Sequence, residues 1–240
     1  MIRFYCPEPE STGVLPPDES AHCCRVLRFQ EGDEINLVDG KGSVFTAKIA
    51  KANPRATTFH ILTKISENKG WDKNLILAVA PTKNADRMEW LVEKAVEMGV
   101  DSIILLKCEH SERKVMRLDR LEKIMVSAMK QSLKAFLPEL RGPIEISEFI
   151  ESCKDKTGLK VMGYCSPEVK RVDFSNLCQG DSDVIVMIGP EGDFSSKEVK
   201  LAIESGFIPI TLGKSRLRTE TAAIYSVAAF HALQNFHSES

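Results

Sequence analysis

The pattern of apolar and polar positions changes near residue 70. Before this point, apolar residues alternate with polar ones in short runs, as they do in strands with one buried face. Beyond it, short continuous apolar runs alternate with amphipathic helical patterns, which is typical of a parallel sheet covered by helices. The pattern therefore predicts two domains, residues 1–70 and residues 71–240, the first rich in strands and the second of the α/β class.

In the first domain, three alternating runs predict strands at 34–38, 43–50 and 57–65. The segment 22–28 predicts one or two helical turns. The short spacing of these elements favours a small β-barrel of about five strands.

The second domain contains five apolar runs that predict the strands of its parallel sheet, at 75–80, 103–107, 159–164, 184–188 and 208–212. An amphipathic pattern predicts a helix at 118–134. Ser195 with Glu198, and Asp86 with Glu89, have the spacing of capping boxes, so each pair predicts the start of a further helix.

The last predicted helix, which reaches about residue 235, is apolar on nearly all its sides. Such a helix needs cover on two sides, and its own sheet supplies only one. A second subunit is the simplest source of the other cover. The pattern therefore predicts a homodimer that forms through the C-terminal domain.

Two glycine-marked turns follow the last two predicted strands, at 189–193 and 213–218. If the two strands are neighbours in an open parallel sheet, their turns form a ligand-binding crevice at the carboxyl ends of the strands. Gly213-Lys214-Ser215 imitates the end of a phosphate-binding P-loop, but Ile208 occupies the position where that motif requires glycine. No G-x-G-x-x-G motif follows a strand either, which argues against a dinucleotide-binding fold.

Composition narrows the classes of partner. The 240 residues include 32 Lys and Arg against 34 Asp and Glu, so bulk charge does not attract nucleic acid and any RNA binding depends on local patches. Seven cysteines occur without the spacing of a metal site or a disulfide framework, which predicts no metal and reduced thiols. With no secretory leader or membrane-length apolar run, the sequence predicts a cytoplasmic protein without a membrane segment.

The most basic segment lies between Lys107 and Arg141, with nine Lys or Arg against five acids. Arg117 and Arg120 fall on the polar side of the predicted helix at 118–134. This segment is a candidate RNA-binding surface. The alternative is an ordinary solvated helix face, since charged outer faces are common.

The runs 188–195 and 212–223 resemble the two signature segments of the RsmE family, the ribosomal RNA small subunit methyltransferase E proteins. This family belongs to the SPOUT superfamily of S-adenosylmethionine-dependent RNA methyltransferases. The resemblance also covers 111–113 and 130–132, although Leu133-Lys134 stands where many members have Gly-Arg, which leaves the role of Lys134 open. It implies an α/β trefoil-knot domain and an N-terminal PUA-like RNA-binding domain.

The resemblance further implies methylation of N3 of a uridine in 16S rRNA of the small ribosomal subunit, with S-adenosylmethionine as cofactor. The residues implied in cofactor binding are Gly163, Tyr164, Ile188, Gly189, Glu191, Gly192, Leu212, Gly213, Leu217, Arg218, Thr221 and Ala222. The residues that we expect to contact RNA are Arg3, Arg25, Arg28, Arg113, Arg117 and Arg120. For each of these arginines, ordinary surface exposure is the alternative.

Two charged residues near the second signature are candidate catalytic groups. Our hypothesis is that Arg218 stabilises negative charge on a uracil carbonyl oxygen and that Glu220 accepts the N3 proton, directly or through water. The alternative is a structural ion pair that holds the turn or the dimer interface. Two other functions remain open at this point: methylation of ribose or guanine by the same fold, and a non-catalytic RNA-binding module.

Overall fold

The computed structural model describes residues 2–166, 169–178 and 182–235. Contacts within the chain divide these residues into two units. The first unit contains the residues up to Gly70 together with Met125–Leu137, and the second contains Trp71–Ile124 together with the described residues from Pro138 onward. The predicted ranges of 1–70 and 71–240 assign Met125–Leu137 to the other domain.

The first unit is built on a four-stranded sheet with the order β1-β2-β3-β4. The strands are β1 (Arg3–Tyr5), β2 (Glu34–Val38), β3 (Ser43–Lys51) and β4 (Thr58–Ser66). β1 pairs in parallel with β2, and the other neighbours are antiparallel. The described residues form one strand fewer than the five expected. Phe4, Leu37 and Phe45 are buried in the core of this unit.

Short helical segments connect β1 to β2, namely α1 (Pro9–Thr12), α2 (Pro17–Ala21) and η1 (His22–Val26). The helical turn expected at 22–28 is a π-helix over five of these residues. Arg28, just beyond it, has a left-handed backbone with φ of 60°.

The segment 125–137 joins the first unit through backbone and side-chain hydrogen bonds. The Gly42 amide donates to the Ala135 carbonyl at 3.0 Å, and the Leu137 amide donates to the Gly40 carbonyl at 2.9 Å. Gly42 also lies against Phe136, whose ring would be 2.4 Å from a Cβ at that position. These contacts are long-range in sequence, so local patterns could not reveal that the segment belongs here.

The second unit contains a seven-stranded, fully parallel sheet with the order β7-β6-β5-β10-β8-β11-β9. The five predicted strands are β5 (Leu75–Val79), β6 (Ser102–Lys107), β8 (Leu159–Gly163), β10 (Val184–Ile188) and β11 (Ile208–Thr211). The sequence did not indicate the edge strands β7 (Glu139–Glu145) and β9 (Val172–Asp173). Both lack a continuous apolar run because their side chains are only partly buried.

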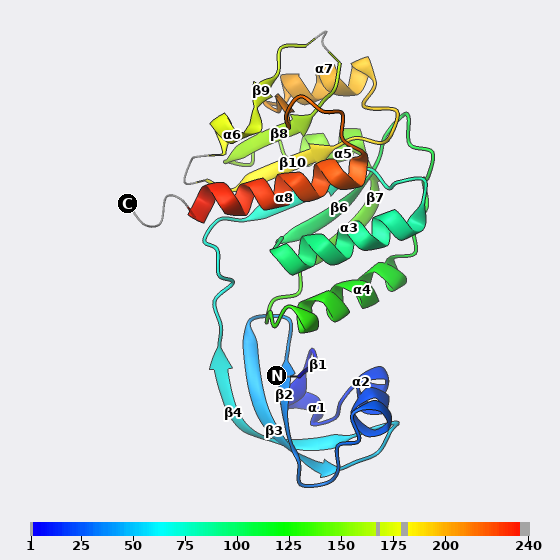
Figure 1. Ribbon diagram of the computed structural model, residues 1–240, viewed down its shortest axis with the longest axis vertical. Coiled ribbons are helices and arrows are strands. Elements are labelled where there is room, and N and C mark those ends of the chain that lie inside the picture. The colour runs from blue at the N-terminus through cyan, green and yellow to red at the C-terminus, as the bar shows by residue number, and fades with distance from the viewer. Residues whose placement is uncertain (1, 167–168, 179–181, 236–240) are drawn as a thin grey trace. The chain divides into compact units, whose positions relative to one another are not determined.

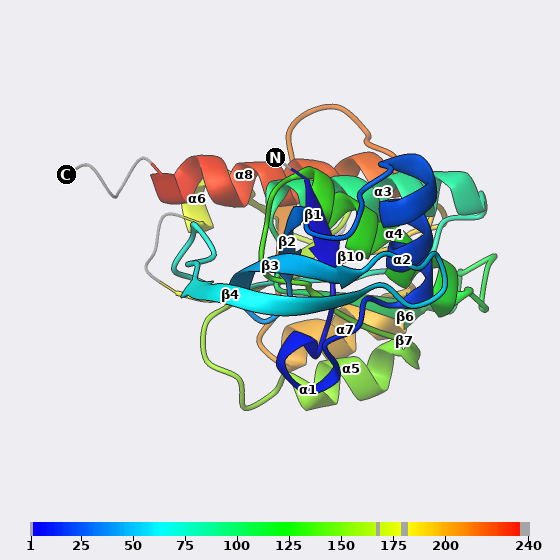
Figure 2. The same ribbon diagram turned by 90° about the horizontal axis from the view of Figure 1, so that it is seen from below.

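Helices cover both faces of this sheet (Figures 1 and 2). α3 (Ala85–Met98) and α8 (Thr219–Asn235) pack together on one face. α5 (Ile146–Ser152) and α7 (Ser196–Glu204) pack together on the other. The remaining helices are α4 (Leu118–Gln131) and the short α6 (Phe174–Leu177). None of the helices in the described part of the chain is long and apolar enough to cross a membrane.

The two signature turns do not follow neighbouring strands, which corrects the expectation from sequence. β8 lies between β10 and β11 and pairs with both. The sequence gives no sign of this arrangement because strand order in a parallel sheet depends on crossover connections rather than on local pattern. Three strand ends, rather than two, therefore meet at the crevice.

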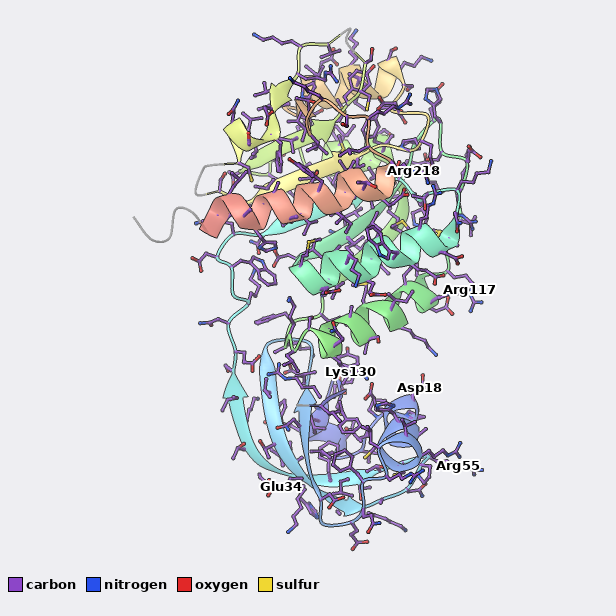
Figure 3. All side chains as sticks on the ribbon, viewed as in Figure 1. Asp18, Glu34, Arg55, Arg117, Lys130 and Arg218 are labelled. Carbon is purple, nitrogen blue, oxygen red and sulfur yellow. The ribbon has the colours of Figure 1, made fainter. Side chains whose placement is uncertain are left out.

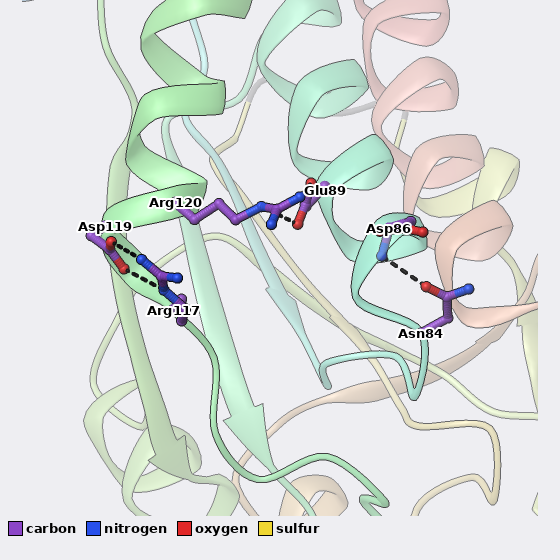
Figure 4. A network of polar contacts seen from close by, with 6 residues as sticks. All are labelled: Asn84, Asp86, Glu89, Arg117, Asp119 and Arg120. Atoms are coloured by element: carbon purple, nitrogen blue, oxygen red, sulfur yellow. Dashed lines mark hydrogen bonds and ion pairs between the residues drawn. The ribbon is translucent and has the colours of Figure 1, made fainter.

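The capping predictions have different outcomes. Ser195 and Glu198 form both hydrogen bonds of a capping box at the start of α7, as predicted. The predicted box of Asp86 and Glu89 is wrong, because α3 begins earlier and Asn84 caps it by accepting from the Asp86 amide (Figure 4). The Glu89 carboxylate instead pairs with Arg120 at 2.6 Å.

Leu133 has an unfavourable backbone conformation, with φ of 54° and a side chain that is 44% exposed. A left-handed conformation costs a residue with a Cβ about 1–2 kcal/mol, whereas glycine adopts it freely. We expect Leu133→Gly to raise the free energy of unfolding by about 0.5–1 kcal/mol, after the larger entropy of glycine in the unfolded chain is subtracted. Denaturant unfolding measures this change. Leu133→Ala is the matched control, because it removes the side chain and keeps the strain, and equal stability of the two variants would contradict the prediction.

Candidate functional site

A pocket of about 1050 Å³ opens at the carboxyl ends of β8, β10 and β11 in the second unit. Both signature segments and the end of β8 line it. Ten of the predicted cofactor-binding residues belong to its wall, namely Gly163, Tyr164, Ile188, Gly189, Glu191, Leu212, Gly213, Leu217, Arg218 and Ala222. Gly192 and Thr221 are not part of the wall. The structure thus brings together three chain segments that are far apart in sequence.

One buried hydrogen bond ties the two signature turns together. The Thr219 hydroxyl, at the start of α8, donates to the Gly189 carbonyl at the end of β10 at a distance of 3.0 Å. Thr219 is almost fully buried. The sequence suggested Thr219 only as a possible helix cap, because nothing local indicates that its partner lies 30 residues away.

The turn after β10 is held by a second group of polar contacts. Asp193 has a left-handed backbone with φ of 63°, and its carboxylate accepts from the amides of Cys165 and Phe194 at 3.0 and 2.9 Å. His110 Nδ1 lies 3.1 Å from the carbonyl oxygens of Gly192 and Asp193. A Cβ at Gly192 would lie only 3.0 Å from that of His110. Gly192 therefore permits close packing against His110.

Glu191 reaches from the pocket wall to the loop before α3. Its Oε1 accepts from the Lys83 backbone amide at 3.0 Å. The Lys83 ammonium pairs with Glu112 at 2.7 Å, and the Lys83 carbonyl accepts two hydrogen bonds from Arg113 at 2.8 and 3.1 Å. Glu191 and Arg113, which we predicted to contact cofactor and RNA, thus both fasten this loop in the structure.

The two candidate catalytic residues lie in different environments. The exposed Arg218 lines the pocket just before α8 (Figure 3). Glu220 is only 7% exposed and is absent from the pocket wall. Its Oε1 lies 3.6 Å from Arg87 on α3, and its buried Oε2 has no hydrogen-bond partner among the described residues. This ion pair is the contact that the structural alternative requires.

The predicted RNA-binding arginines differ in how freely they reach solvent. Arg3 is only 9% exposed, and its guanidinium holds Glu67 at 2.6 Å and the Leu133 carbonyl at 2.6 Å, so it fastens the segment 125–137 to the sheet. Arg25 and Arg28 are exposed beside the π-helix.

On the polar side of α4, the other two arginines are exposed but paired. Arg117 holds Asp119 at 2.8 Å, and Arg120 holds Glu89 across to α3 (Figure 4). Counting charges along the sequence did not reveal these pairings. They reduce the positive charge that this surface presents to a phosphate.

Cys165 is the one exposed cysteine among the described residues, and it lines the pocket. Desolvation and the nearby Asp193 carboxylate raise the pKa of its thiol, although Arg216 and Arg171 oppose the shift. Since the thiolate is the reactive form, Cys165 is a poor nucleophile at neutral pH. Within the described ranges, no three His, Cys, Asp or Glu side chains are grouped to hold a metal ion.

Comparison with known proteins assigns the family. The sequence model of an RNA methyltransferase domain matches residues 69–231, and that of an RNA methyltransferase PUA domain matches residues 15–62. The ribosomal RNA small subunit methyltransferase E of Mesomycoplasma hyopneumoniae (strain 232) is 31% identical over 236 residues, which cover 94% of this chain and 96% of that protein. This chain belongs to the RsmE family. The mixed α/β fold with its parallel sheet and the PUA-like N-terminal sheet are those expected of an RsmE protein.

Solved structures extend the likeness to the whole chain. A probable rRNA-methyltransferase from Porphyromonas gingivalis is 42% identical, with a TM-score of 0.92 over 99% of this chain and all of that one. A ribosomal RNA small subunit methyltransferase E from Neisseria gonorrhoeae, bound to S-adenosyl methionine, is 30% identical, with a TM-score of 0.84 over 97% of this chain and 98% of that one.

Thr219→Val tests the link between the two signature turns. The change keeps the size of the side chain but leaves the Gly189 carbonyl without its buried donor, which typically lowers stability by about 1–3 kcal/mol. We expect weaker binding of S-adenosylmethionine in calorimetry, because the two walls of the pocket are no longer held together. Thr219→Ser keeps the hydroxyl and should bind like the wild type. Equal affinity in Thr219→Val and the wild type would show that the bond does not shape the pocket.

Proposed function

We propose that this RsmE protein uses S-adenosylmethionine to methylate N3 of a uridine in 16S rRNA, and so acts in the cytoplasm during maturation of the small ribosomal subunit. The observation that carries the proposal is the pocket, because both RsmE signature segments line it. The RsmE relative from Neisseria gonorrhoeae, whose fold this chain shares, is bound to S-adenosyl methionine. Its RsmE relatives are also named for the small-subunit ribosomal RNA.

The pocket residues fit an adenosine-containing cofactor. Ile188, Leu212 and Leu217 provide apolar side chains that would cover the adenine. A Cβ at Gly213, where φ is 116°, would meet nothing within 4 Å, so the backbone there is open to a ligand. Gly163 and Gly189 likewise offer backbone groups without side chains in the way. The volume of about 1050 Å³ is large enough for the cofactor together with part of a nucleotide.

The chemistry requires a positioned nucleotide and a way to remove its imide proton. S-adenosylmethionine, when bound, supplies a methyl group that is already activated by a positively charged sulfur. Arg218 lies at the pocket with its guanidinium exposed, so it can donate hydrogen bonds to a uracil carbonyl oxygen. That contact stabilises the negative charge that develops as N3 loses its proton.

Arg218→Ala tests this role. We expect the single-turnover rate of methyl transfer at saturating cofactor to fall about 100-fold, which is typical for the loss of one charge-stabilising donor. Arg218→Lys keeps the positive charge and should retain part of the rate. Mass spectrometry of the digested rRNA locates the methyl group. Unchanged rates in both variants would remove Arg218 from the mechanism, and a methyl group on ribose or guanine would replace the uridine assignment.

Glu220 is the proposed acceptor of the N3 proton, and its environment supplies a sharp test. As the acceptor, it acts from behind Arg218 and reaches the base directly or through water. Glu220→Gln should then lower the single-turnover rate by about 100-fold or more while Arg87→Gln has a smaller effect.

The rival role of Glu220 is an ion pair with Arg87 that holds α8 against α3. If this is its only role, Glu220→Gln and Arg87→Gln should both lower the midpoint of thermal unfolding and leave the rate of transfer near that of the wild type. Measuring rate and thermal stability on the same two variants separates the alternatives.

We further propose that the second unit carries the trefoil knot of its superfamily and that two copies pair through α8. The chain returns from β11, beyond β8, to α8, which lies against β5 and β10, and this path supports the knot. On α8, Tyr225 is 50% exposed, and on the adjacent α3, Trp90 is 45% exposed. A second subunit would cover these large apolar side chains.

A further inference from the structure

The loop between β11 and α8 carries three cationic side chains at the mouth of the pocket. Lys214, Arg216 and Arg218 are all exposed and all line the pocket. The loop from Leu212 to Arg218 contains no acidic residue. It arches away from the body of the second unit, as the orange segment before α8 shows in Figure 2.

The acidic side chains of the pocket wall do not neutralise these cations. Asp173 accepts from the backbone amide and the hydroxyl of Ser175 at 3.0 and 2.7 Å, where it caps α6. Asp193 and Glu191 are each bonded to the backbone amides described above. Within the described part of the chain, neither Lys214 nor Arg216 forms an ion pair. Both charges are therefore available to an anion from solution.

The contrast with α4 indicates where an RNA backbone is held. Arg117 and Arg120 already have carboxylate partners, and Arg113 donates to a backbone carbonyl. A phosphate that binds to a paired arginine must compete with that partner, whereas Lys214 and Arg216 offer uncompensated charge.

The ligand follows from what a base must do to react in this pocket. An enzyme that modifies a base acts on a single strand or turns the nucleotide out of its stack, so the base enters the pocket while its phosphates remain at the mouth. We propose that Lys214 and Arg216 bind the phosphodiester groups that flank the target nucleotide and so position its base. This inference rests on the proposed function, because it assumes an RNA substrate at this pocket. Neither residue acts on the reacting atoms.

The double variant Lys214→Gln/Arg216→Gln tests the inference. Binding to unmethylated small ribosomal subunits is measured over a series of salt concentrations, and binding of S-adenosylmethionine is measured by calorimetry. We expect affinity for the subunit at low salt to fall about 10-fold or more, and the slope of log K against log salt to decrease by about 1.4, or roughly 0.7 for each lost phosphate contact on a single strand. Cofactor affinity should stay within about two-fold of the wild type, because neither side chain is assigned to the cofactor.

Two further double variants serve as controls. Lys197→Gln/Lys200→Gln removes the same charge from exposed positions on α7 and should change both the affinity and the slope less. Lys214→Arg/Arg216→Lys exchanges the two side chains, keeps both charges and should bind like the wild type. Thermal unfolding confirms that each variant is folded.

The outcomes separate the inference from the function on which it rests. If the wild type binds cofactor and methylates the subunit, but the loop variant has the same slope as the α7 variant, the phosphate contacts are refuted and the methyltransferase stands. If the loop variant loses affinity for S-adenosylmethionine instead, the two cations bind the carboxylate of the cofactor and the inference is wrong. If the wild type binds no cofactor, the proposed function itself has failed.

Discussion

The pocket depends on the buried hydrogen bond from the Thr219 hydroxyl to the Gly189 carbonyl. The two turns that it joins follow β10 and β11, and β8 separates these strands in the sheet. Backbone pairing with a neighbouring strand therefore cannot hold one turn against the other. A buried carbonyl without a donor is costly, so this single hydroxyl fixes both the start of α8 and the end of β10. Arg218, which immediately precedes Thr219, is thereby held at the pocket mouth.

Local features of the fold could be read from the sequence, and long-range pairings could not. The apolar runs locate the five central strands, and the Ser195–Glu198 box marks the start of α7, because both signals lie within a few residues. The position of β8 between β10 and β11 leaves no local trace. Nor does the packing of 125–137 on the first unit, where Arg3 joins Glu67 to the Leu133 carbonyl. These features depend on contacts between residues that are 64 and 130 positions apart.

The same limit applies to the charges at the candidate site. A count of residues favours the segment around α4 as the most basic, but Asp119 and Glu89 pair with two of its arginines. Lys214 and Arg216 attract little notice in the sequence, since the P-loop they imitate is incomplete. The structure reverses this ranking, because an electrostatic field depends on which charges have partners and not on how many occur in a segment. Sequence identified the signature segments correctly as pocket walls, yet Glu220 points to Arg87 and away from the wall.

Three residues other than glycine adopt left-handed backbones, and in at least two of them tertiary hydrogen bonds compensate for the strain. The Leu133 carbonyl accepts from Arg3 at 2.6 Å, and the Asp193 carboxylate binds two backbone amides. The third, Arg28, directly follows the π-helix segment and precedes Phe29, whose amide donates to Cys23 at 3.1 Å. Strained conformations persist where surrounding structure holds them, and Asp193 belongs to the pocket itself. The turn after β10 is therefore stiff before any ligand arrives, which lowers the entropy that binding must remove.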